Sequence, residues 1–339
     1  MKIMNVNILL FLSTLCFVLF PEGAHALSFD GNTNVIFITI DGVRWQEFIN
    51  NRPDKLLMHG DHAPIFKFLW DQKEKGNGVI VGNRHKKDRM TVSNIHNLSL
   101  PAYQSIFLGE ATDCASNDCS SVSKETFLEK IKDELELDET QMGVFASWNR
   151  IGRAIEKTKG NIHSNIEFQK YIDPLYPNDE VFNWVNENQF KDVPLWHGSR
   201  FDKYTYALAL RYLELHHPKF LYLSLVDSDE WGHLSDYYNY IQTLRQYDHW
   251  LEQLFERVKR IKGYGENTII IVTTDHGRGK SRLLWPHHAA VIPSSKYVWM
   301  YLWDSNGVLS QMKKNGEIDL KKMEHNDIRP MIESFFNLN

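Results

Sequence analysis

The sequence has 339 residues, of which 42% are hydrophobic, so it is long enough and apolar enough to bury a large core. Its formal net charge of −5, without a long block of lysine and arginine, excludes the charge pattern of a nucleic-acid-binding protein. The 10 tryptophans fit a packed globular protein rather than a disordered chain.

The start of the chain has the pattern of an export signal. Lys2 supplies a positive charge, residues 8–20 form an apolar run, and Ala24-His25-Ala26 fits a cleavage site between small residues. The run is short for a membrane span, and no later run reaches the ~20 apolar residues that spanning needs. We therefore expect a cleaved signal peptide at residues 1–26 and an exported protein, periplasmic or extracellular, without a membrane span. An uncleaved signal that anchors the protein is the alternative.

Six short apolar runs rich in β-forming residues predict strands, and the segments 203–216 and 237–262 have apolar residues at helical spacing. Strands that alternate with helices indicate an α/β fold with a mostly parallel sheet covered on both faces. The runs at 35–40 and 268–273 are almost continuously hydrophobic, which is typical of strands buried on both sides. The predicted strands are Val35–Ile40, Gly78–Val81, Met142–Phe145, Phe220–Leu225, Thr268–Thr273 and Tyr297–Leu302.

Residues 27–339 are expected to form a single domain, because no segment has the composition of an independent linker. Residues 113–200 are less regular and rich in tryptophan in their second part, so we interpret them as a candidate insertion over the functional site. This segment also holds Cys114 and Cys119, the two cysteines that remain after the signal. In an exported chain such a pair predicts a disulfide, with two free thiols as the alternative. A zinc site between them is disfavoured because the intervening residues include no histidine.

Three of the predicted strands end in acidic residues. Asp41 follows the first strand, Asp227 and Asp229 follow the fourth, and Asp275-His276 follows the fifth. In doubly wound sheets, ligands bind beyond the carboxyl ends of the strands. A single aspartate at such a place usually caps a helix or forms a turn. Three strands that deliver aspartate to one edge, two of them with histidine nearby, predict a metal site.

The mixture of carboxylate and imidazole ligands suits zinc, whereas magnesium favours oxygen alone. Asp229 and His233 are four residues apart, so both can face one point if the chain makes a helical turn. Asp227 is a rival for Asp229, at a spacing of six that suits a turn less well. His287 and His288 supply two further candidate imidazoles.

Ser99 is the candidate nucleophile. Pro101 and the apolar pattern after it predict a helix that begins at or just after Ser99. The free backbone N–H groups and the positive end of the helix dipole stabilise an alkoxide or a bound phosphate there. A serine before a proline is also an ordinary helix cap, so a purely structural role is the alternative.

Taken in order, these segments resemble the alkaline phosphatase superfamily, and within it the phosphodiesterase and nucleotide-pyrophosphatase-like branch. The resemblance extends over most of the mature chain. Each motif is weak by itself, and their common order makes the match specific. One departure is Ala289, where the family usually has a glycine after the last histidine. The matched motifs are Asp41-Gly42, Ser99-x-Pro101 with Gly109, Asp229-x-x-Gly232-His233, Asp275-His276-Gly277, and His288 five residues before Pro293.

The resemblance implies an alkaline phosphatase-like three-layer sandwich, with a central sheet flanked by helices. It also implies a phosphoric ester hydrolase, secreted if the signal is cleaved, that acts through a phosphoseryl intermediate on Ser99. Two divalent metal ions are implied, with zinc as the family's usual choice and manganese or another divalent ion as the alternative. It favours His288 over His287 as the last ligand. The ligands that it implies are Asp41, Ser99, Asp275 and His276 for one ion, and Asp229, His233 and His288 for the other.

A donor to the phosphate oxygens is also expected. Asn117 is the candidate, because related diesterases place an asparagine downstream of the nucleophile and the predicted disulfide would fix its loop. A turn-forming asparagine is the alternative. Arg278 is a weaker candidate, and a plain surface charge is its alternative interpretation.

The expected partner is a small phosphate ester, with phosphodiesters or nucleotide pyrophosphates slightly favoured over monoesters. A sulfatase would need an arginine where Tyr103 stands. Phosphoethanolamine transferases use related ligands, usually on a domain attached to several membrane helices. A catalytically inactive protein that binds phosphorylated ligands is the alternative from another class. The sequence predicts no nucleic-acid-binding surface and no particular oligomeric state.

Overall fold

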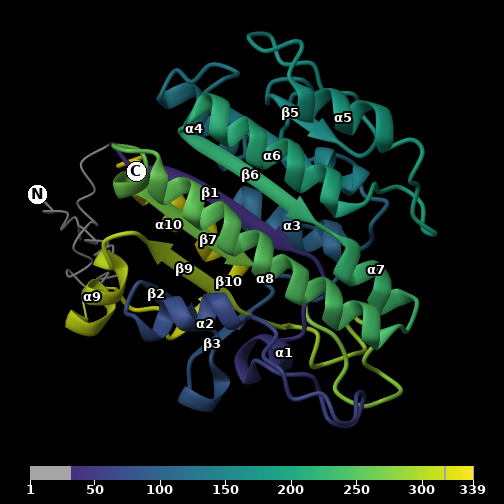
Figure 1. Cartoon of the computed structure of the whole chain (residues 1–339). Helices are drawn as coiled ribbons and strands as arrows, with labels where there is room; N and C mark the ends of the chain where they lie inside the picture. Colours follow the sequence, from purple (N-terminus) through teal and green to yellow (C-terminus); the bar gives the residue numbers. More distant parts are fainter. Residues whose placement is uncertain (1–31, 317, 339) are drawn as a thin grey trace, which may run out of the picture.

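A computed structural model describes residues 32–316 and 318–338; the predicted signal at residues 1–26 lies outside the described residues. Seven of its strands form a central sheet in the order β2-β9-β7-β1-β6-β4-β5 (Figure 1). β9 runs antiparallel to its neighbours β2 and β7, and the other pairings in this sheet are parallel. The strands are β1 (Asn34–Ile40), β2 (Gly78–Val81), β4 (Met142–Ala146), β5 (Ser164–Ile166), β6 (Phe220–Leu225), β7 (Thr268–Thr273) and β9 (Met300–Asp304).

Helices cover both faces of the sheet, because alternate residues of the central strands point to opposite sides. In β1, Ile36 and Ile38 belong to one buried cluster, whereas Val35 and Phe37 belong to the other. The first cluster includes residues of α1 (Trp45–Asn50), α2 (Lys67–Glu74), α5 (Glu180–Asn188), α6 (Asp202–His216) and α8 (Tyr237–Arg260). The second includes residues of α3 (Ser99–Leu108), α4 (Phe127–Glu134), α9 (Val308–Asn315) and α10 (Ile328–Phe335).

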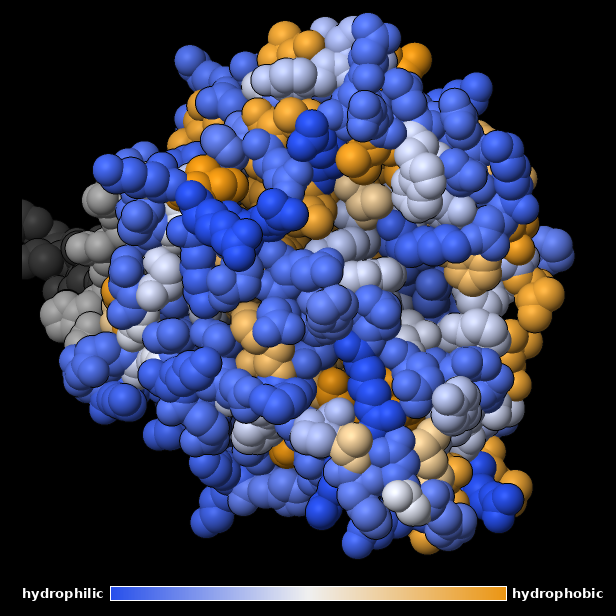
Figure 2. Space-filling view, in the orientation of Figure 1, coloured by the Kyte–Doolittle hydropathy of each residue, from blue (hydrophilic) through white to orange (hydrophobic). Residues whose placement is uncertain are grey.

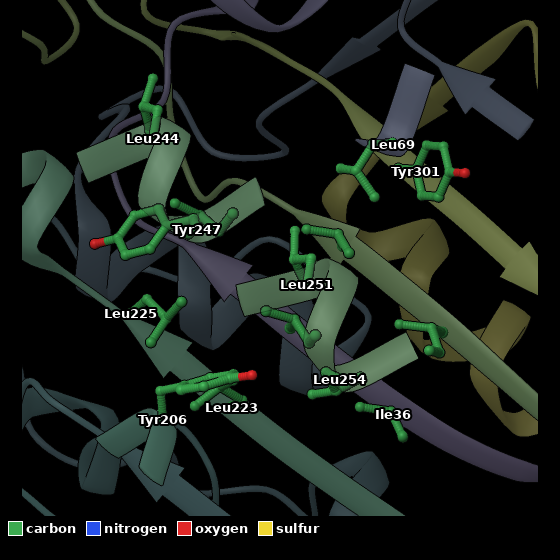
Figure 3. Packing of buried hydrophobic residues seen from close by; sticks show 14 of the residues in the cluster. Ile36, Leu69, Tyr206, Leu223, Leu225, Leu244, Tyr247, Leu251, Leu254 and Tyr301 are labelled. Carbon is green, nitrogen blue, oxygen red and sulfur yellow. The ribbon is translucent and has the colours of Figure 1, made fainter. Parts of the chain in front are cut away.

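The longest helix, α8, shows how the helical spacing of the sequence produces this packing. Leu244, Leu251 and Leu254 of α8 belong to the same buried cluster as Ile36 and Leu223 of the sheet (Figure 3). All five side chains are almost completely buried. Burying a leucine in this way stabilises the fold by about 2 kcal/mol relative to leaving it exposed. Among the residues described, no helix combines the length and the hydrophobicity that crossing a bilayer requires.

The structure confirms the predicted α/β fold, and all six predicted runs are strands. The last run is divided in two: β8 (Tyr297–Val298) and β9 are separated by the buried Trp299. β8 leaves the central sheet and pairs with β3 (Arg89–Thr91), which pairs in turn with β10 (Lys322–Glu324). These strands of two or three residues, like β5, are too short to show an alternating pattern in the sequence.

Residues 113–200 contribute to the fold as well as to its periphery. α4 and β4 from this segment belong to the layers of the sandwich, and β5 extends the sheet at one edge. Near the end of the segment, the Trp196 ring packs 5.2 Å from the ring of Trp231, which belongs to α7 (Asp227–His233). The segment therefore borders the sheet edge that carries the candidate site, and its covering of that site stays a prediction.

Candidate metal centre and nucleophile

The neighbouring strands β7, β1 and β6 end at the same edge of the sheet, and each is followed by an aspartate of the predicted site. Two groups of side chains there could each hold a metal ion, since one ligand atom from each member lies within 4.8 Å of the others. The first group is Asp41, Asp275 and His276, and the second is Asp229, His276 and His288.

His276 is at the centre of the first group. Its Nε2 atom lies 3.5 Å from Asp41 Oδ1, 3.4 Å from Asp275 Oδ2 and 3.1 Å from Ser99 Oγ. All four residues are buried. The structure therefore brings together the carboxylates, the imidazole and the hydroxyl that the sequence predicted for one ion.

Two oxygens of this group show that a cation fits there. Asp41 Oδ1 and Asp275 Oδ2 are buried without a hydrogen-bond partner among the described residues. The other oxygen of each carboxylate is satisfied: Asp41 Oδ2 accepts from the Tyr103 hydroxyl at 3.1 Å, and Asp275 Oδ1 accepts from the Gly42 N–H at 3.0 Å. Because a buried carboxylate oxygen without a donor is costly, a divalent ion would stabilise this arrangement. Oxygen and nitrogen ligands together suit zinc.

His233 is not a member of the second group but lies beside it, because the helix α7 places Asp229 and His233 one turn apart. Their Oδ2 and Nε2 atoms are 2.9 Å apart, and His233 Nε2 lies 3.2 Å from His288 Nε2. The rings of His276 and His288 stack with centroids 3.8 Å apart, so His276 lies between the two groups. His233, with 48% of its side chain exposed, opens this group to solvent.

Backbone carbonyls fix the orientation of the two inner imidazoles. His276 Nδ1 donates to the Gly277 carbonyl and His288 Nδ1 donates to the Asn97 carbonyl, each at 3.0 Å. With Nδ1 protonated, Nε2 carries the free lone pair that faces the carboxylates. Burial lowers the pKa of His276 to about 4 and that of His288 to about 3. Both are therefore neutral at physiological pH, the form that binds metal.

The carboxylates differ in their pKa values because their neighbours differ. Burial, followed by repulsion from Asp275 and Asp229, raises the pKa of Asp41 well above its usual range. Burial and Asp229 raise the pKa of Asp275 to about 7. Burial also acts to raise the pKa of Asp229, but the charges of Arg278 and His233 hold it well below its usual range. Crowded acidic groups of this kind are common at functional sites.

Arg278 joins three segments of the site from inside. Its Nε donates to the Gly42 carbonyl at 3.1 Å, one amino group donates to the backbone and side-chain oxygens of Asp229, and the other donates to the Pro286 carbonyl. The side chain is completely buried, so the alternative interpretation of Arg278 as a surface charge is wrong. Its guanidinium group donates to these partners and does not face an open phosphate pocket.

Ser99 is the first residue of α3 and is 3% exposed. The extended backbone of Leu98 and the position of Pro101 in the first turn explain why the helix begins here. The Ser99 hydroxyl thus lies at the positive end of the helix dipole as well as beside the first group of ligands.

Asn117 lies next to the nucleophile, in the loop that the Cys114–Cys119 disulfide closes. Its Oδ1 accepts from the backbone N–H of Leu100 at 2.9 Å, so it caps the first turn of α3 one residue after Ser99. Its role as a donor to phosphate stays a prediction.

Two rival residues lie outside both groups. Asp227 accepts from the backbone N–H of Asp202 at 3.2 Å, and His287 is exposed.

Tyr103, which the sequence marked only as a departure from the sulfatase pattern, contacts the candidate ligand Asp41. It lies one helical turn after Ser99, and this spacing is the signal that could have placed it at the site.

The comparisons with known proteins agree with this geometry. Residues 202–295 match the family model described as the metalloenzyme superfamily. A search of curated proteins finds no match. A 2-O GAG sulfatase is similar in structure, with a TM-score of 0.56 and 10% identity over 91% of this chain and 71% of the sulfatase.

Two further solved structures have the same fold. A protein in the alkaline phosphatase superfamily from Vibrio parahaemolyticus has a TM-score of 0.54 and 14% identity, over 90% of this chain and 66% of its own. The C-terminal periplasmic domain of a phosphoethanolamine transferase from Campylobacter jejuni has a TM-score of 0.53 and 12% identity, over 91% of this chain and 90% of that domain. The segment that matches the family model runs from α6 through the last histidine of the site. Part of the chain therefore matches the metalloenzyme superfamily model, and the chain as a whole has an alkaline phosphatase-like fold.

Proposed function

We propose that this protein is a secreted, metal-dependent phosphoric ester hydrolase that uses Ser99 as its nucleophile. One observation carries the proposal: Ser99 Oγ lies at the start of α3 and 3.1 Å from His276 Nε2, the atom around which the candidate ligands converge. Members of the superfamily are metal-dependent enzymes that transfer phosphoryl or sulfuryl groups, and a serine in this place suits such a transfer.

The ligand set suits two divalent ions, with zinc as the first choice for mixed carboxylate and imidazole donors. Asp41, Asp275, His276 and Ser99 would hold one ion, and Asp229, His233 and His288 the other. Such a pair of ions polarises the phosphoryl group and stabilises charge on the attacking and leaving oxygens.

The side chains and backbone of the protein would carry out the nucleophilic attack, bind the phosphate and position the ligands. Ser99 Oγ attacks phosphorus, the bond to the leaving alcohol breaks, and a water later hydrolyses the phosphoserine. The N–H groups of the first turn of α3 attract the phosphate oxygens. Tyr103 holds Asp41 by its hydroxyl, and Arg278 holds the segment that carries Asp229.

Phosphodiesters or nucleotide pyrophosphates are the favoured substrates, because the motifs resemble that branch most closely. The similarity to a sulfatase keeps sulfate esters as a second candidate. Against that candidate, the buried Tyr103 occupies the place of the arginine of the sulfatase motif and donates to Asp41. The similarity to a phosphoethanolamine transferase supports a third outcome, in which an alcohol rather than water accepts the group.

Export to an oxidising compartment is part of the proposal. The Cys114–Cys119 pair is within disulfide distance, with Cα atoms 5.7 Å apart, and disulfides persist outside the cytosol. The apolar run at residues 8–20 supports the same conclusion.

The test is hydrolysis of p-nitrophenyl phosphate and bis-p-nitrophenyl phosphate by the mature protein, with zinc and with a chelator. We expect chelator-sensitive turnover, faster on the diester, that Ser99→Ala abolishes while metal content stays near that of the wild type. Ser105→Ala is the matched control, because Ser105 is buried on the same helix and donates only to the Pro101 carbonyl. Activity of Ser99→Ala within tenfold of the wild type would remove Ser99 from the role of nucleophile.

A further inference from the structure

The four large hydrophobic side chains with the greatest exposure among the described residues belong to segments that contact or adjoin the candidate site. Leu283 and Val291 are 83% exposed, Leu195 is 82% exposed and Ile95 is 78% exposed. A single exposed leucine is ordinary on a protein surface, whereas a group of them around one site indicates a binding surface. We define the apolar rim as Ile95, Leu195, Leu234, Leu283 and Val291.

Two members of the apolar rim flank the second ligand group from opposite chain segments. His288 Nδ1 donates to the Asn97 carbonyl at 3.0 Å, and Asn97 Nδ2 donates to the Ala289 carbonyl at 3.4 Å. Ile95 lies two residues before Asn97, and Val291 lies two residues after Ala289. These hydrogen bonds therefore join the two chain segments that carry Ile95 and Val291.

Two other members lie on the side of α7. Leu234 directly follows the site residue His233 and is 51% exposed. Leu195 precedes Trp196, whose ring packs on Trp231 in the same helix. The apolar rim thus approaches the site from both sides.

Leu283 lies in a loop that is held in place at its base. The Gly279 N–H donates to the His287 carbonyl at 2.9 Å, which closes the loop next to His288. Trp285 is buried against Tyr237, with ring centroids 5.0 Å apart. The loop is therefore anchored, while Leu283 points its side chain into solvent.

The same loop is basic. Lys280 and Arg282 are exposed, and residues 279–292 contain no acidic residue, although the chain as a whole has a net charge of −5. Figure 2 shows a mostly hydrophilic face with hydrophobic groups in its upper part and along its right-hand edge, and Figure 1 places α7 on the right-hand side. Exposed leucines with adjacent lysine and arginine are the combination that binds anionic membrane surfaces.

We infer that the apolar rim, with Lys280 and Arg282, docks this protein onto an anionic lipid surface. The leucine, isoleucine and valine side chains enter the interfacial region, and the two cations bind the headgroups. Docking by a rim around the site brings headgroup phosphates to Ser99. That the lipid headgroup ester is also the substrate rests on the proposed function. The docking itself needs neither metal nor turnover.

Co-sedimentation of the mature protein with vesicles of phosphatidylglycerol, compared with vesicles of phosphatidylcholine, tests this inference. We expect binding that favours phosphatidylglycerol. Leu283→Ser combined with Val291→Ser should lower the partition coefficient by about tenfold or more. Lys280→Gln combined with Arg282→Gln should weaken binding to phosphatidylglycerol by about fivefold for each charge. Val308→Ser is the matched control, since Val308 is exposed at the start of α9, across the molecule from α7 (Figure 1).

Two results would overturn the inference. One is a wild-type protein that sediments with neither kind of vesicle. The other is a Leu283→Ser, Val291→Ser variant that binds vesicles as the wild type does, or that changes only self-association in sedimentation velocity, which would assign the rim to a second copy of the chain. Turnover of a soluble p-nitrophenyl ester, measured in parallel, reports on the proposed function separately.

Discussion

Arg278 passes directly over Gly232: a Cβ atom at position 232 would lie 2.4 Å from Arg278 Cζ. Glycine is therefore required at position 232 of the Asp229-x-x-Gly232-His233 motif. The buried side chain of Arg278, from the segment that follows β7, occupies the space that a Cβ atom would need. The same guanidinium donates to Asp229, so the glycine and the ligand are fixed by one side chain.

Gly232→Ala is the first prediction that follows. Alanine would favour the helix by about 1 kcal/mol, but it would displace Arg278, and overpacking of this kind costs about 1–3 kcal/mol. We expect lower thermal stability and reduced zinc content by elemental analysis. Gly152→Ala is the control, because its Cβ would meet only Ile166 Cδ1 at 3.4 Å. Equal losses in both variants would contradict this explanation.

Arg278→Gln should be more damaging than Gly232→Ala. Removing one partner of a buried ion pair costs about 3–5 kcal/mol, because Asp229 would keep a buried charge without its counter-ion. Thermal melts of the single and double variants check this. Once Arg278 is shortened, Gly232→Ala should cost little more, so additive losses would show that the two residues do not interact.

The placement of many residues of this candidate site could be predicted from sequence, because motifs at strand ends depend on local chain geometry. Asp41, Asp229 and Asp275 each follow a strand that is apolar enough to be recognised, and the parallel sheet brings the strand ends together. The role of Arg278 could not be predicted in this way. Its partners Gly42 and Asp229 are distant in the sequence, and no periodic pattern shows that a charged residue is completely buried.

Tyr103→Phe should leave the fold intact and affect the first ligand group. The variant removes the donor to Asp41 Oδ2 while keeping the ring that packs in the core. Loss of a hydrogen bond to a charged group costs about 1.5–3 kcal/mol, so we expect metal affinity to fall by about 10- to 100-fold. Isothermal titration of the metal-free protein with zinc measures this. Tyr222→Phe is the control, since its hydroxyl is hydrogen-bonded to Thr39 and not to a ligand.

The contribution of Asp275 to the stability of the metal-free protein should fall as the pH rises from about 4 to about 7. Its pKa is raised to about 7 in the folded state, so over this range Asp275 binds more protons in the folded chain than in the unfolded chain. Stability falls with rising pH wherever the folded state holds more protons. In the presence of chelator, Asp275→Asn should therefore gain stability over the wild type at pH 8 but not at pH 4. A difference between their melting temperatures that does not change with pH would contradict this.

Asn117 offers a test that separates support of the helix from contact with substrate. Its Oδ1 caps the Leu100 N–H, and only its Nδ2 could donate to a phosphate oxygen. Asn117→Asp keeps the acceptor, and a carboxylate is favourable at a helix N-terminus, so this variant should be as stable as the wild type. It lacks the donor and repels phosphate, so its turnover should fall by about 100-fold, in line with the loss of one oxyanion donor. Asn117→Ala should lose about 1 kcal/mol of stability as well, because the cap is gone. If Asn117→Asp keeps full activity and only Asn117→Ala is impaired, Asn117 supports the helix and does not donate to the substrate.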